Sequence, residues 1–181
     1  MYIEVWDKDY SSSDDLLYSQ YTNIYGYYEF SNINNVDLDE GGTNEWYLKF
    51  ILLGWPPFQT SGGDGYTWVQ SLDVAKNWQN AYYGTWSIGI LPDGTVRNVG
   101  TVVFTDSRNA NILYAVMKEC YWMNFHCYGW DMPNVVVFYP GTTSATDVDD
   151  YEIEIAGPGK SAYDHAMDDD VVLHEYGHDV M

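Results

Sequence analysis

Short segments that alternate between apolar and polar residues occupy most of the first hundred positions. In the segment Glu45–Phe50, residues Trp46, Leu48 and Phe50 fall on one side of an extended chain and polar residues on the other. This period of two is typical of a half-buried strand. Pro92-Asp93-Gly94 predicts a tight hairpin turn. The expected strands are Tyr2–Trp6, Ile24–Phe30, Trp46–Leu53, Tyr66–Gln70, Gly84–Ile90 and Val96–Phe104. Regular short strands with Gly- and Asn-rich connections predict an antiparallel β-sandwich over residues 1–104.

The periodicity changes after residue 104. Apolar residues recur at helical spacing from Ile112 to Met123, which predicts a helix that begins at Asp106 or Ser107 and ends near Phe125. After it we expect a buried strand at residues 135–139, a polar loop at 142–150, a strand at 151–156 and a second helix capped by Asp168–Asp170. The chain is therefore expected to be α+β, with a β-sandwich at 1–104 and a helix–strand–strand–helix segment at 105–181.

Acidic residues dominate the charge of this chain. The formal net charge is -20, from 27 Asp and Glu residues against 7 Lys and Arg residues. Such a surface repels phosphate backbones, so we expect no nucleic-acid partner. No apolar run approaches the ~20 residues that span a bilayer, so we expect no membrane insertion. The acidic, aromatic composition favours an extracellular or cell-surface location, with any leader removed before residue 1.

The segment at residues 171–181 contains the motif His-Glu-x-x-His. On a helix, residues four apart share one face, so His174 and His178 can aim their imidazoles at one point. A zinc ion accepts imidazole nitrogen at about 2.0–2.1 Å. Glu175 would then act as the general base for a metal-activated water that attacks a peptide carbonyl.

The string His174-Glu175-Tyr176-Gly177-His178, after acidic residues and a short aliphatic run, resembles the zincin metallopeptidases, especially secreted HEYGH-type members. The resemblance implies that His174 and His178 are zinc ligands, that Glu175 is catalytic, and that the substrate is a protein or peptide. It also implies that residues 105–181 form the N-terminal half of a zincin domain. The strand Tyr151–Ala156 would border the cleft and pair with extended substrate.

Zincins need a third protein ligand, which in the familiar families follows the second histidine. Only three residues follow His178. Three explanations stay open: the chain is part of a longer enzyme, a partner completes the site, or the module no longer catalyses. Upstream of the motif, the residues that could replace the missing third ligand are His165 and the carboxylates of Asp168–Asp170.

Four carboxylates flank a serine-rich segment near the N-terminus: Asp7, Asp9, Asp14 and Asp15. Calcium takes six to eight oxygen ligands, so these residues are candidate calcium ligands. The segment resembles the calcium loops of C2 domains, and Tyr21–Phe30 resembles transthyretin-like modules. The alternative is a solvated loop, because Asp and Ser favour turns.

Tryptophans and cysteines add further expectations. We expect four tryptophans to be core residues, with sugar stacking as the alternative: Trp55, Trp68, Trp78 and Trp86. Cys120 and Cys127 are expected as buried free thiols, with a disulfide as the next alternative and a metal pair beside His126 as a further one.

Three functions are consistent with these features. The first is a secreted zinc-dependent endopeptidase, or its N-terminal portion. The second is a non-catalytic extracellular structural protein, such as a surface-layer or filament subunit, which would assemble with copies of itself. The third is a calcium-dependent carbohydrate-binding module, based on the acidic loop and the aromatic residues.

Overall fold

A computed structural model describes residues 1–9, 13–23, 25–31, 33, 45–54, 66–90, 95–103, 107–126, 134–161 and 163–180. The expected hairpin at Pro92-Asp93-Gly94, the indole of Trp55 and the two thiol groups lie outside the described part. The chain forms two compact units: Met1–Ile51 with Tyr83–Thr105, and Leu52–Tyr82 with Asp106–Met181. The expected division at residue 104 differs from this one, because residues 52–82 group with the second unit.

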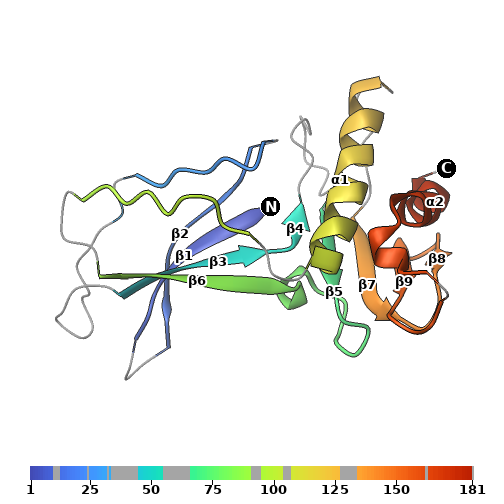
Figure 1. The fold of residues 1–181 in the computed structure, drawn as a ribbon, viewed down its shortest axis with the longest axis horizontal. Coiled ribbons are helices and arrows are strands. Elements are labelled where there is room, and N and C mark those ends of the chain that lie inside the picture. The colour runs from blue at the N-terminus through green and yellow to red at the C-terminus, as the bar shows by residue number, and fades with distance from the viewer. Residues whose placement is uncertain are drawn as a thin grey trace. The chain divides into compact units, whose positions relative to one another are not determined.

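An antiparallel sheet forms the first unit (Figure 1). Its strand order is β2-β1-β3-β6. The bounds are β1 Tyr2–Asp7, β2 Asp15–Tyr21, β3 Glu45–Ile51 and β6 Tyr83–Ile90. Direct pairing of Val5 with Leu48 and of Ile3 with Phe50 puts apolar side chains opposite each other on one face of the sheet. The alternation in residues 45–50 is therefore confirmed as strand β3.

The core of the first unit lies on that one face and consists of Ile3, Val5, Trp46, Leu48 and Phe50. Part of its cover comes from Tyr28, Phe30, Val99 and Val102. The strands expected at Ile24–Phe30 and Val96–Phe104 are wrong for the described residues, since 27–30 and 96–103 form no regular strand. The apolar side chains in these segments pack on the core without joining a ladder, and Val96 is 93% exposed.

Strand β2 was not expected from the sequence, because its first residues were interpreted as part of an acidic loop. It pairs with β1 from Tyr2 opposite Tyr21 to Asp7 opposite Asp15, with one register shift. Asp7 is therefore the last residue of a strand, and its side chain is buried.

The second unit contains a mixed sheet with the strand order β4-β5-β7-β9-β8. The bounds are β4 Leu53–Gly54, β5 Thr67–Gln70, β7 Val135–Gly141, β8 Ala145–Asp147 and β9 Glu152–Ala156. Strands β5, β7 and β9 run parallel, and β4 and β8 pair antiparallel to their neighbours. Val135, Val136 and Val137 are all 0% exposed, as expected for a parallel strand covered on both faces.

The sheet edge differs from the sequence-based expectation. The strand expected at the cleft border, Tyr151–Ala156, lies between β7 and β8. Among the described strands, the edge on that side of the sheet is β8, within the segment interpreted as a polar loop. A three-residue strand shows too little alternation to be recognised, whereas Ile153 and Ile155 are fully buried, as a central strand requires.

Two helices pack against this sheet (Figure 1). Helix α1, Ser107–His126, contacts β4 and β5, and helix α2, Asp169–Val180, contacts β8 and β9 as well as α1. Short 3₁₀ turns occur at Trp78–Asn80 (η1) and His165–Met167 (η2). The long helix expected after residue 105 is confirmed, and the described chain is a mixed α+β protein that is rich in strands.

Candidate metal centre

The acidic residues before α2 hold its N-terminus. The Asp168 side chain accepts a hydrogen bond from the Asp170 backbone N–H at 3.1 Å. Asp169 and Asp170 lie in the first turn, where negative charge interacts favourably with the helix dipole. The expected capping of this helix is confirmed, with Asp168 as the residue that caps.

One face of α2 is anchored in the second unit. Val172 and Tyr176, four residues apart, are both 0% exposed. On α1, the Asn111 side-chain amide donates to the Ala166 carbonyl and to Asp169 Oδ1, each at 3.0 Å. These contacts fix the rotation of α2 about its axis, so that the side chains of His174 and His178 are exposed.

The two histidines converge through their ring nitrogens. His174 Nε2 and His178 Nε2 lie 3.2 Å apart. The ring centroids are 4.7 Å apart and the ring planes cross at 88°. Two imidazole ligands at 2.0–2.1 Å from a tetrahedral zinc ion would have nitrogens roughly 3.3–3.4 Å apart. The observed separation therefore matches two ligands of one ion, and without an ion it suits a hydrogen bond between one donor and one acceptor nitrogen.

Glu175 is held from the sheet edge. The Thr146 hydroxyl on β8 lies 2.8 Å from Glu175 Oε2 and 2.9 Å from the Glu175 backbone oxygen. Because a hydroxyl has one proton, it donates to these two acceptors as a shared or alternating bond. Glu175, which lies between the two histidines in the sequence, thus has its carboxylate held by a side chain from another element.

A third ligand is not found among the residues that the structure describes. No group of three or more His, Cys, Asp or Glu side chains there could hold a metal ion. Three of the four upstream candidates for a third ligand are engaged elsewhere, and the fourth, Asp170, is exposed. His165 Nδ1 is 2.7 Å from Ser144 Oγ, and its Nε2 is 2.6 Å from Ser161 Oγ. Asp168 caps α2 and Asp169 accepts from Asn111. The described donor set for a cation is thus the histidine pair.

The candidate calcium ligands lie in the first unit. Asp7 and Asp9 are buried, and Asp15 is exposed at the start of β2. Asp14 accepts from the Asp9 backbone N–H at 3.2 Å and from the Tyr47 hydroxyl at 2.7 Å. The acidic segment is therefore organised by protein hydrogen bonds that the sequence did not indicate.

The burial of the tryptophans decides which of them are core residues and which are exposed. Trp68 is a core residue, as expected, and its indole N–H donates to Gln70 at 2.7 Å. Trp78 and Trp86 are more than 40% exposed, so their placement in the core was wrong. Thr146 and Asn111 were missed altogether, because a single polar residue in a loop or on a helix gives no pattern.

None of the helices in the described residues has the length and apolar character needed to cross a membrane. A scan against protein-family models, a search of curated proteins and a search of solved structures each find no match for this chain.

Proposed function

We propose that the C-terminal segment carries the site of a zincin-type, zinc-dependent endopeptidase, or of its N-terminal portion, which cleaves protein or peptide substrates outside the cell. The observation that carries this proposal is the 3.2 Å approach of His174 Nε2 to His178 Nε2 on an anchored helix. As the architecture we propose a sandwich-type N-terminal module, because segments 25–33 and 95–103 supply side chains that cover the core face of its sheet.

The donor chemistry fits zinc. Imidazole nitrogens are preferred zinc ligands, and two of them at this separation can share one tetrahedral ion. The remaining protein ligand would come from residues outside the described ranges or from another polypeptide. Bound there, zinc supplies Lewis acidity and lowers the pKa of water.

Glu175 would handle protons in the reaction. Its carboxylate, one residue from His174 on α2, would take the proton of the attacking water and deliver it to the leaving amine. Thr146 would act as a positioning residue, because its hydroxyl contacts Glu175 Oε2. The proposed role of Glu175 is thus general acid–base catalysis, with its carboxylate held in a fixed orientation by Thr146.

Strand β8 supports a peptide as substrate. It is an edge strand among the described elements, with β9 as its ladder partner. An edge strand offers backbone N–H and C=O groups to an extended peptide. Because Thr146 lies on β8, such a peptide would run beside Glu175.

The test separates metal binding from catalysis. We expect one zinc site by titration, with affinity at least about tenfold weaker in His174→Ala and in His178→Ala. Glu175→Gln should keep that affinity and lose cleavage of casein. Asp149→Asn, an equal charge change at an exposed position of the same unit and outside the proposed site, is the matched control and should keep both properties. Unchanged zinc affinity in His174→Ala would refute the metal site, and cleavage by Glu175→Gln at the native rate would refute the assigned base.

A further inference from the structure

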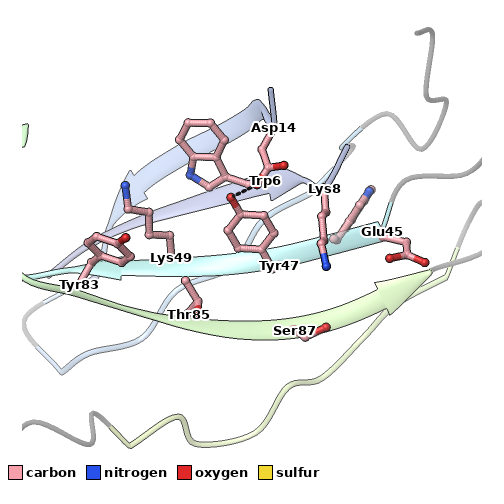
Figure 2. A pocket seen from close by; sticks show the side chains of 10 residues that line it. Trp6, Lys8, Asp14, Glu45, Tyr47, Lys49, Tyr83, Thr85 and Ser87 are labelled. Atoms are coloured by element: carbon pink, nitrogen blue, oxygen red, sulfur yellow. Dashed lines mark hydrogen bonds between the residues drawn. The ribbon is translucent and has the colours of Figure 1, made fainter. Parts of the chain in front are cut away.

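The outward face of the first sheet contains a hollow that none of the preceding assignments uses. It has a volume of about 620 Å³ and lies over β1, β3 and β6 (Figure 2). Trp6, Tyr47 and Tyr83 provide its aromatic surface, and Thr85 and Ser87 add hydroxyl groups. The core of the unit lies on the opposite side of the same strands, since Leu48 and Phe50 alternate with Tyr47 and Lys49.

Two of the aromatic rings are held in place by carboxylates. Trp6 and Tyr47 are direct cross-strand partners, and their ring centroids are 6.5 Å apart with planes only 11° from parallel. The Trp6 indole N–H donates to Glu4 at 2.8 Å, and the Tyr47 hydroxyl donates to Asp14 at 2.7 Å. Burial, followed by the bond to Asp14, raises the pKa of Tyr47 well above its ordinary value, so the phenol stays neutral. Rings fixed before binding lose little entropy when a ligand arrives.

Charged side chains of both signs lie at the hollow. Lys49 Nζ lies 3.8 Å from Glu4, 5.6 Å from the centre of the Trp6 ring and 4.5 Å from that of Tyr83. The remaining charged side chains of the lining are Lys8, Asp14 and Glu45. Among the lining side chains two cations thus face two anions, and Glu4 beside Lys49 adds a third carboxylate, in a chain that has 7 Lys and Arg residues and a net charge of -20. A strongly anionic ligand would find no complementary field here.

Backbone groups of β1 and β3 are not open to a ligand in the hollow. Strands β1 and β3 each have a ladder neighbour on both sides, so their backbone hydrogen-bonding groups are already paired within the sheet. A ligand therefore meets ring faces, hydroxyl groups and paired charges. These groups suit a molecule with apolar C–H faces and many hydroxyl groups.

We propose that this hollow binds a neutral saccharide of about two pyranose rings, a size consistent with ligand pockets of roughly 300–1,000 Å³. The C–H face of a sugar ring packs on Tyr83 and Trp6, and sugar hydroxyl groups bond to Asp14, Lys49 and Glu45. This site is independent of the histidine pair, because all of its residues belong to the first unit. Loss of zinc binding or cleavage would leave it intact.

The test is affinity electrophoresis of the full chain in gels that contain hydroxyethyl cellulose, glycogen or galactomannan, with alginate and heparin as anionic probes. We expect retardation by at least one neutral polysaccharide and by neither anionic one. Calorimetry with the matching disaccharide should then show affinity at least about tenfold weaker in Tyr83→Ala, a loss typical of a central aromatic contact. Tyr27→Ala removes a tyrosine of the same unit with similar exposure, outside the hollow, and should bind as the native chain does.

Tyr83 is more than half exposed, so its replacement leaves the core of the unit in place. Tyr47→Phe provides a second variant, because it removes the bond to Asp14 and keeps the ring. Three results would each overturn the proposal: no retardation by any of the neutral polysaccharides, retardation by the anionic probes alone, or equal binding by the native chain and Tyr83→Ala.

Discussion

Replacing Thr146 by valine tests whether the edge strand positions the carboxylate of the candidate metal centre. The substitution keeps the branched shape of the side chain and removes the hydroxyl that lies 2.8 Å from Glu175 Oε2 and 2.9 Å from the Glu175 backbone oxygen. Within the described part of the chain, the Thr146 hydroxyl bonds to Glu175 and to neither histidine ring. The change should therefore affect Glu175 and leave zinc affinity unchanged.

The magnitude follows from the kind of bond that is lost. A hydrogen bond to a charged group contributes about 1.5–3 kcal/mol to stability. The hydroxyl has one proton for two acceptors, and the site is only partly buried, so we expect a loss of about 1–2 kcal/mol in the free energy of unfolding. If the same orientation is required in the transition state, kcat/KM should fall by roughly 5–30-fold.

Three measurements on one set of variants check this prediction. Urea denaturation gives the free energy of unfolding, calorimetric titration gives zinc affinity, and a quenched-fluorescence peptide gives kcat/KM. Thr143→Val is the matched control, because Thr143 is exposed and its hydroxyl donates weakly to the Ser144 carbonyl at 3.4 Å. The control should stay within about 0.5 kcal/mol of the native chain.

A double-mutant cycle with Glu175→Ala isolates the contact itself. The two substitutions should couple by about 1–2 kcal/mol in unfolding free energy, within the range seen for residues in contact. Additive effects would show that the hydroxyl and the carboxylate do not interact. A fall in zinc affinity in Thr146→Val would show that the edge strand supports the histidines and not Glu175.

Three further predictions concern the framework of the second unit. Tyr176→Ala should lower the free energy of unfolding by about 3–5 kcal/mol, because it empties a fully buried site beneath the histidine helix; thermal denaturation checks this. Gln70→Leu should cost more than about 2 kcal/mol, since Gln70 is 0% exposed and bonds Trp68, Asn77 and the Val74 and Ala75 carbonyls; a native-like urea midpoint would contradict it. Burial alone would raise the pKa of Glu154, but hydrogen bonds from Thr142 and Thr143 outweigh burial and lower the pKa below its usual 4.5. Its stabilising contribution is therefore complete above about pH 4.5 and is lost as the pH falls through the lower folded value, so Glu154→Gln should flatten the acid decline of stability measured down to about pH 3.

Elements with a long, regular pattern could be predicted from the sequence. The alternation of Trp46, Leu48 and Phe50 fixes one face of β3, and the run from Val135 to Val137 identifies a strand buried on both sides. Helix α1 has twenty residues over which helical spacing can be seen. In each case the burial of many side chains outweighs the preferences of single residues.

Other elements depend on partners that lie far away in the chain. Strand β8 is three residues long and exists because β9 pairs with it. Residues 27–30 have an aromatic pattern suited to a strand, yet Tyr28 and Phe30 pack on the core of the first unit without ladder bonds. Local propensity cannot distinguish a side chain that packs from a backbone that pairs.

The candidate metal centre likewise contains some residues that the sequence predicts and others that it does not. His174, Glu175 and His178 are recognisable because their spacing follows the turn of a helix. Thr146, which holds Glu175 from 29 residues away, and Asn111, which holds the start of α2, become visible only in three dimensions. The reactive residues of this site can thus be recognised from a short stretch of sequence, whereas the residues that position them can be found only from the tertiary fold.

The first unit is interrupted by a segment that belongs to the second. Strands β3 and β6 are neighbours, with Ile51 opposite Tyr83, and all of residues 52–82 between them group with the other unit. During synthesis, β5 must therefore wait for β7, its parallel neighbour, which is made more than sixty residues later, and Val69 stays without its ladder partner Val137 until then. A fragment that stops at residue 105 would leave β5 without this neighbour and should aggregate, whereas joining residue 51 to residue 83 through a short turn should release the first unit as a soluble piece.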